Sequence, residues 1–152
     1  MENFNITTKK TFELVDITSE VQKIITKSGV ASGMVLIFSP HTTAGIICNE
    51  AESRLKEDIL KIAETLKNNS EVFGGFAHDA DEGPPARSAG SRRAGEAGNA
   101  AAHIVSSFSG NSRTFIIENG KVVLGTWQAI IFLELDGPRT RQVWVKMIPD
   151  HP

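Results

Sequence analysis

Apolar positions along the chain follow the two spacings that distinguish helices from strands. Leucine, isoleucine and alanine recur every three or four residues from about residue 50 to residue 66, which predicts an amphipathic helix. A shorter helix is predicted from Thr18, whose hydroxyl can cap it, to Gly29. The unbroken apolar run 34–38 predicts a strand that is buried on both faces, and Pro40 ends it.

The last third of the chain has the pattern of antiparallel sheet. Segments 114–118 and 121–124 flank an Asn-Gly pair, which accepts positive φ at both turn positions and therefore indicates a tight hairpin. Two further strands are predicted at 128–135 and 142–148, on either side of a turn that contains Gly and Pro. An earlier strand is predicted at 10–17.

The segment from Asp79 to Asn99 separates these two halves. It is dominated by Gly, Ala, Ser, Pro and Arg and has no apolar period, which predicts a mobile surface loop. Loops of this length are often lids or disordered insertions, and both interpretations stay open, since its three arginines favour an anion-facing lid only weakly. Asn99 then begins a helix that Gly110 ends.

Composition limits the classes of protein that fit this chain. Its 152 residues, 40% hydrophobic and 22% charged, suit one soluble domain spanning residues 1–152. Sixteen basic and eighteen acidic residues give a net charge of −2 without charge blocks, which argues against nucleic-acid binding. No segment approaches the roughly 20 apolar residues that cross a bilayer, and no signal peptide leads the chain, so we expect a cytoplasmic protein. The single cysteine, Cys48, excludes an internal disulfide and is expected to be buried rather than a nucleophile.

Polar residues gather where the apolar run 34–38 ends. Residues 39–43 read Ser-Pro-His-Thr-Thr, and the carboxyl of Glu50 follows before the predicted helix. A rigid strand end can hold an imidazole and two hydroxyls in a fixed geometry toward a ligand. Two interpretations remain open at this point, a binding site and a capped turn.

Three of the four histidines stand at predicted structural transitions. His41 follows a strand, His78 precedes the loop and His103 lies in the first turns of the helix after it, whereas His151 is in the tail. Neutral imidazoles are common ligands of divalent metals, and three of them leave a coordination position open for water or substrate. The wide spacing of the three leaves the alternative that they are separate surface or capping histidines.

Glu134 lies inside the apolar strand predicted at 128–135. A carboxylate there has to be paired, metal-bound or at the strand's edge, so Glu134 could complete metal coordination or act as a general base. A glutamate paired with Arg139 or Arg141 is the alternative. These arginines follow the turn and offer planar guanidinium groups suited to carboxylate or phosphate. Gln128 could place an amide donor in a pocket.

Five separated motifs of the chain resemble one known family. The motifs are His41-Thr42-Thr43-Ala44 through Asn49-Glu50, His78-Asp79, Ala102-His103, Leu124-Gly125-Thr126-Trp127-Gln128, and Glu134 through Asp136-Gly137-Pro138-Arg139. In this order they are similar to the YjbQ or UPF0047 family, also called the secondary thiamine-phosphate synthase family, over nearly the whole chain. The resemblance implies an α+β fold, an antiparallel β-sandwich with two main helices, assembled as a homotrimer with a polar pocket near the subunit boundaries.

The same resemblance implies roles for individual residues. It places His41, His78 and His103 in the polar pocket, where we expect them to be ligands of a divalent metal, zinc or alternatively magnesium, without an organic cofactor. It makes Glu134, His41 and Gln128 catalytic. The residues it implies for substrate binding are Thr42, Thr43, Asn49, Glu50 and Arg139. The segment between the second and third histidines is longer than the family pattern, which leaves the placement of the second histidine open.

The activity that the resemblance implies is condensation of a pyrimidine diphosphate with a thiazole phosphate, named as a secondary activity in the family. We therefore expect a transferase that acts on a small phosphorylated metabolite, with the metal, Arg139 and the hydroxyls of Thr42 and Thr43 stabilising the leaving pyrophosphate. Two alternatives use the same residues. One is a metal-dependent hydrolase of a small phosphorylated or acylated metabolite, with Glu134 as base, and the other is a non-catalytic trimeric module that binds a metal or a metabolite.

Overall fold

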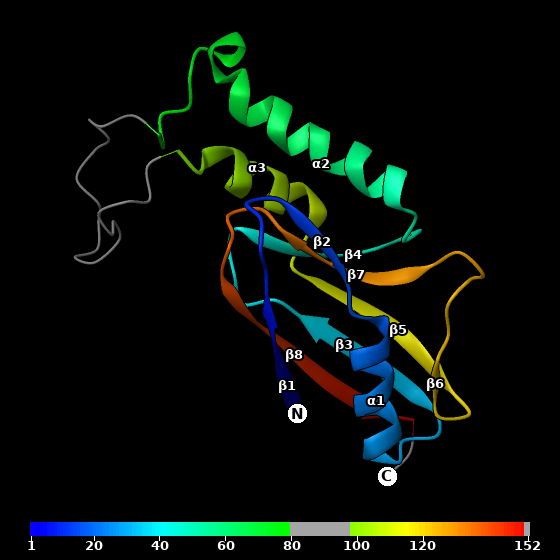
Figure 1. Cartoon of the computed structure of the whole chain (residues 1–152). Coiled ribbons are helices and arrows are strands. Elements are labelled where there is room, and N and C mark those ends of the chain that lie inside the picture. The colour runs from blue at the N-terminus through cyan, green and yellow to red at the C-terminus, as the bar shows by residue number, and fades with distance from the viewer. Residues whose placement is uncertain (80–97, 151–152) are drawn as a thin grey trace, which may run out of the picture.

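The computed structural model describes residues 1–79 and 98–150, which form an α+β fold (Figure 1). The strands are β1 (Glu2–Thr7), β2 (Glu13–Asp16), β3 (Gly33–Phe38), β4 (Ala44–Asn49), β5 (Ser112–Glu118), β6 (Lys121–Val122), β7 (Ala129–Glu134) and β8 (Thr140–Pro149). The helices are α1 (Thr18–Ser28), α2 (Ser53–Asn68), the 3-10 helix η1 (Ser70–Phe73) and α3 (Ala100–Ser109).

One sheet contains five antiparallel strands in the order β1-β8-β3-β5-β6. The long strand β8 pairs with β1 on one side and with β3 on the other. β5 and β6 form the predicted hairpin, in which Asn119 and Gly120 have φ values of 51° and 72°. This left-handed backbone is what so tight a turn requires, which explains the Asn-Gly pair.

The second sheet has three antiparallel strands in the order β2-β7-β4. Its central strand β7 is buried over its whole length because both of its faces are covered. Ile130 and Phe132 belong to the core shared with α1 and the five-stranded sheet, whereas Ile131 and Leu133 belong to a second core that includes residues of α2 and α3. In Figure 1, α2 and α3 lie across this sheet on the side away from the five-stranded sheet.

The structure confirms most of the predicted elements. The helices predicted from residues 18, 50 and 99 correspond to α1, α2 and α3, and Gly29 and Gly110 stand at the ends of two of them. The capping side chains differ from the prediction, however. The Thr18 hydroxyl accepts the Ile130 N–H at 2.9 Å instead of capping α1. The side chain of Asp79, rather than that of Asn99, accepts an N–H at the start of α3.

Two expectations are wrong, and two strands were not predicted. The described residues contain three α-helices instead of two main ones, and strands β1 and β4 have no counterpart in the predicted set. β3 alternates between buried and exposed residues, whereas the apolar run predicted burial on both faces. The physical reason is that only one face of the five-stranded sheet packs on the core, so the other face of β3 stays outside.

Several expectations fall outside what the structure describes. The predicted loop between Asp79 and Asn99, with its three arginines, lies almost wholly in residues 80–97, and His151 also lies beyond the described residues. Within the described part of the chain, no helix is long and apolar enough to cross a membrane. The β-sandwich and the homotrimer stay predictions of the resemblance.

Candidate functional site

A cavity of about 230 Å³ opens where three distant segments meet. These segments are the connection from β3 to β4, the start of α3 and the turn from β7 to β8. The lining residues are Pro40, His41, Thr42, Thr43, Asn99, His103, Asp136, Arg139 and Arg141. A groove of about 650 Å³ shares four of these residues with the cavity, including both histidines, and runs past Phe38 along the side of α3.

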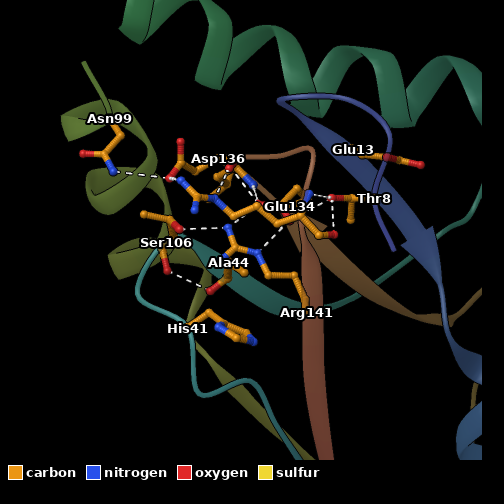
Figure 2. Close-up of polar contacts among 12 residues, drawn as sticks. Thr8, Glu13, His41, Ala44, Asn99, Ser106, Glu134, Asp136 and Arg141 are labelled. Atoms are coloured by element: carbon orange, nitrogen blue, oxygen red, sulfur yellow. Dashed lines mark hydrogen bonds and ion pairs between the residues drawn. The ribbon is translucent and has the colours of Figure 1, made fainter. Parts of the chain in front are cut away.

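A buried ion pair between Glu134 and Arg141 lies beside the cavity (Figure 2). The Glu134 side chain is fully buried and that of Arg141 is 7% exposed. Arg141 donates from Nη2 to Glu134 Oε1 at 2.6 Å and from Nε to Oε2 at 2.8 Å. The N–H groups of Leu135 and Asp136 also donate to Oε1, and the Thr8 hydroxyl donates to Oε2. Both oxygens of this carboxylate therefore accept hydrogen bonds, as a charge in a protein interior requires. This arrangement favours the interpretation that Glu134 pairs with an arginine over the interpretation that it acts as a general base.

The same ion pair ties together the strand ends around the cavity. Arg141 Nη2 also donates to Thr43 Oγ1 at 3.0 Å, which joins β8 to the residues just before β4. The hydroxyl of Thr8, just after β1, accepts the Arg139 N–H at 2.9 Å and lies 3.0 Å from the Arg139 carbonyl oxygen. The positions of Arg139 and Arg141 at the cavity therefore depend on Glu134 and Thr8.

His41 is held as a neutral hydrogen-bond acceptor. Its Nε2 accepts the backbone N–H of Gln142 at 2.9 Å. Burial, and then the nearby positive charge of Arg141, lower the pKa of His41. A neutral ring whose Nε2 is an acceptor carries its proton on Nδ1, so the hydrogen bond fixes the tautomer.

The other two histidines belong to a chain of polar contacts at the base of α3. The rings of His78 and His103 meet edge to face, with centroids 4.9 Å apart. His78 Nε2 lies 3.1 Å from Asn99 Oδ1, and Asn99 Nδ2 donates to Asp136 Oδ2 at 3.3 Å. Asp136 in turn accepts from Arg139 Nη2 at 2.9 Å. The chain of contacts thereby fixes the direction of Arg139.

The predicted three-histidine metal site is wrong for the described residues. Within residues 1–79 and 98–150, no three His, Cys, Asp or Glu side chains are grouped so that they could hold a metal ion. The donor atoms explain this, because His41 Nε2 already accepts a backbone N–H and His78 Nε2 contacts an amide side chain. The oxygens of Glu134, the other expected ligand, are taken up by its own partners. In the part of the chain that the structure describes, these side chains therefore form no ligand group for a divalent metal.

Three predicted site residues lie at the opposite end of the three-stranded sheet. Asn49 is in register with the first residue of β7, five residues and roughly 17 Å from Glu134 at the rise of a strand. Gln128 Oε1 accepts the N–H of Gly125 at 2.8 Å, and Asn49 Oδ1 accepts the N–H of Glu50 at 2.9 Å. The described lining of the cavity does not include these three residues. The structure thus divides the predicted site into two groups.

Sequence reasoning missed two residues that organise the cavity. Thr8 holds the β7–β8 turn, and Asn99 links His78 to Asp136. Asn99 was expected only as a helix cap, and no pattern in the sequence marks Thr8. Their one shared signal is a polar residue beside the end of a strand or helix, which is too common to identify a site.

Comparison with known proteins settles the family. The family model described as "UPF0047 protein YjbQ-like" matches residues 2–150. The chain belongs to the YjbQ/UPF0047 family. It is 40% identical over 149 residues to UPF0047 protein YugU of Bacillus subtilis, which covers 97% of this chain and 98% of the relative. It is 41% identical over 148 residues to UPF0047 protein MJ1081 of Methanocaldococcus jannaschii, and the match covers 97% of this chain and 93% of the relative.

Solved structures of YjbQ/UPF0047 relatives have the same fold. A YbjQ-like protein of unknown function from Sulfolobus solfataricus gives a TM-score of 0.81 at 37% identity, over 98% of this chain and 96% of that chain. A YjbQ/UPF0047 protein from Clostridium acetobutylicum gives 0.73 at 40% identity, over 97% and 100%. The family resemblance is thereby confirmed, and so is the α+β fold with antiparallel sheets.

The predicted activity needs correction. The YjbQ/UPF0047 relatives are named by family alone or as being of unknown function, and none of these names indicates thiamine-phosphate synthase activity. The metal that the transferase, the hydrolase and the metal-binding module were expected to use has no group of ligands in the described residues. Family membership therefore establishes the fold of this chain but identifies no reaction. A function has to be argued from the side chains at the cavity.

Proposed function

We propose that the cavity binds the phosphoryl group of a small phosphorylated metabolite directly through its side chains. The observation that carries this proposal is the placement of two guanidinium groups, Arg139 and Arg141, beside His41 in one cavity. Guanidinium groups match the geometry of phosphate oxygens, and a neutral imidazole adds a third donor at Nδ1.

The hydrogen-bonding pattern leaves donors available at the cavity. Arg139 uses Nε and Nη2 for Asp136, and Arg141 uses Nε and Nη2 for Glu134 and Thr43. Among the described residues, neither arginine uses Nη1. The two acidic partners cancel the formal charge of the two arginines, so the site supplies oriented donors rather than a strong positive field. Such a site suits an anion that makes several short hydrogen bonds.

The dimensions support a small metabolite. A cavity of about 230 Å³ leaves room for little more than a phosphoryl group and its immediate substituent. The adjoining groove of about 650 Å³ is lined by apolar residues such as Phe38 and Pro40 and by hydroxyl residues such as Thr42 and Ser106. This mixture of apolar and hydroxyl side chains suits the organic part of a small metabolite whose phosphoryl group lies in the cavity.

Calorimetric titration with inorganic phosphate tests the proposal. We expect saturable binding, unchanged by EDTA, that Arg139→Gln weakens by about tenfold or more because a charged hydrogen bond is lost. Arg54→Gln is the matched control, since Arg54 also pairs with a nearby carboxylate but lies on α2, with its side chain 87% exposed. Phosphate that fails to saturate the wild-type protein, or that binds Arg139→Gln as tightly as wild type, would overturn the proposal.

A further inference from the structure

Among the described residues that line the cavity, Asp136 alone carries a negative charge. Its side chain is 22% exposed and forms an ion pair with Arg139. An ionised carboxylate accepts hydrogen bonds and cannot donate one. The hydroxyls of Thr42 and Thr43 can rotate to donate, and a neutral His103 ring donates from one nitrogen. Asp136 is therefore the group in this wall that repels a ligand oxygen without a proton.

One oxygen of the Asp136 carboxylate makes its contacts with the protein. Oδ2 accepts from Arg139 Nη2 at 2.9 Å and from Asn99 Nδ2 at 3.3 Å (Figure 2). The other oxygen, Oδ1, accepts no hydrogen bond from any residue of ranges 1–79 and 98–150. A carboxylate oxygen at a partly exposed position can take a donor from a ligand, so Oδ1 is available to a molecule in the cavity.

Arg139 would hold a bound anion next to this oxygen. Its Nη2 donates to the Asp136 carboxylate, and its Nε donates to the Asp136 carbonyl oxygen at 2.7 Å. The guanidinium group and the carboxylate thus lie side by side, so an oxyanion that accepts from Arg139 comes close to Oδ1. Two oxygens without a proton would repel each other there, whereas an O–H group of the ligand would donate to Oδ1.

We propose that Asp136 makes the cavity selective for an oxyanion that carries a proton, hydrogen phosphate or a singly protonated phosphate monoester, over sulfate, which carries none. The inference rests on the phosphoryl site proposed above and names its specificity-determining residue. Hydrogen phosphate and sulfate have the same tetrahedral shape and the same charge, so neither size nor charge separates them. The proton on phosphate is the remaining difference, and Asp136 is placed to accept it in a hydrogen bond.

A carboxylate that served only to direct Arg139 would behave differently. Its loss would weaken the binding of phosphate and of sulfate alike. An acceptor that faces the ligand excludes sulfate, so its conversion to an amide should raise the affinity for sulfate. In Asp136→Asn the amide oxygen can keep the contacts with Arg139 and Asn99, and the amide nitrogen then presents a donor to the cavity. The direction in which sulfate affinity changes therefore distinguishes the two roles.

Calorimetric titrations of the whole protein with sodium phosphate and with sodium sulfate, in one buffer at neutral pH, test the inference. We expect the wild-type protein to bind phosphate more tightly than sulfate by about tenfold or more. Asp136→Asn should bind sulfate more tightly than wild type by about threefold or more, which brings the two affinities together. Asp58→Asn is the matched control and should keep the wild-type ratio, since Asp58 also pairs with a basic residue three positions on, Lys61, but is 65% exposed on α2.

The outcomes separate this inference from the phosphoryl site on which it rests. Circular dichroism checks the fold of each variant. If Asp136→Asn does not fold, Asp136→Ala replaces it, and this loss of the acceptor should also bring the two affinities together. Equal affinities of the wild-type protein for the two anions, or an unchanged ratio in the Asp136 variant, refute the selectivity and leave the phosphoryl site standing. A wild-type protein that binds neither anion refutes the phosphoryl site and the selectivity together.

Discussion

The two ends of strand β7 carry polar side chains in opposite environments. At one end, Glu134 is fully buried and accepts hydrogen bonds from four different residues. At the other end, Gln128 is exposed, and its amide oxygen accepts the N–H of Gly125. The resemblance assigned both residues to one site. Five residues of an extended strand suffice to separate them, because a strand spans the sheet rather than folding back.

The difference has a physical cause. A buried carboxylate is tolerated only if charge and hydrogen bonds compensate for its lost hydration, so the Glu134 end must assemble Arg141 and Thr8 around it. An exposed amide such as that of Gln128 stays hydrated and needs no compensating partners. Substitutions at the two ends of β7 should therefore differ greatly in how much they lower the free energy of unfolding.

Glu134→Ala should have the largest effect. It leaves the Arg141 guanidinium buried without its counter-charge, so the free energy of unfolding should fall by about 3–5 kcal/mol. Urea denaturation measures the change. Glu57→Ala, at an exposed position of α2, is the control and should leave stability within about 0.5 kcal/mol of wild type. Equal effects from the two substitutions would contradict the role given to the ion pair.

Thr8→Val should have a smaller but clear effect. The hydroxyl is buried and binds both Glu134 and the Arg139 backbone, so its loss should cost about 1–3 kcal/mol of unfolding free energy. The neighbouring Thr7→Val serves as control, because Thr7 is exposed and makes one long contact with Thr140. If Thr7→Val lowered the free energy of unfolding as much as Thr8→Val, the buried hydrogen bonds of the Thr8 hydroxyl would not be the cause of the effect.

His41→Gln should change how stability depends on pH. Because folding lowers the pKa of His41, the unfolded chain binds more protons just below the ordinary histidine value of about 6.5. Wild-type stability should therefore fall as the pH drops from that value through the lower folded pKa, and His41→Gln should lack this part of the loss. Glutamine can still accept the Gln142 N–H. Parallel curves of melting temperature against pH for the two proteins would contradict the neutral state of His41.

Gln128→Ala should have the smallest effect. It removes one exposed hydrogen bond, so the free energy of unfolding should change by about 0.5 kcal/mol or less. Phosphate affinity should equal that of wild type, because Gln128 is at the far end of β7 from the cavity. A loss of phosphate affinity comparable to that of Arg139→Gln would mean that the two ends of the strand act in one site after all.

The sequence by itself determined the elements whose causes are local. The Asn-Gly turn, the period of α2 and the glycines that end α1 and α3 each depend on a few neighbouring residues, and the structure confirms all of them. The five separated motifs likewise led to the family, since their order along the chain is a property of sequence alone.

The tertiary structure decided which polar residues meet. Thr8 and Glu134 are 126 positions apart, and His41 receives its hydrogen bond from a residue 101 positions away. Such contacts follow from strand register, which no local pattern encodes, and so the sequence could list the histidines without showing that their nitrogens were already engaged. It placed His41 at a strand end, and only the fold showed that the ring lines the cavity while its Nε2 accepts the N–H of Gln142.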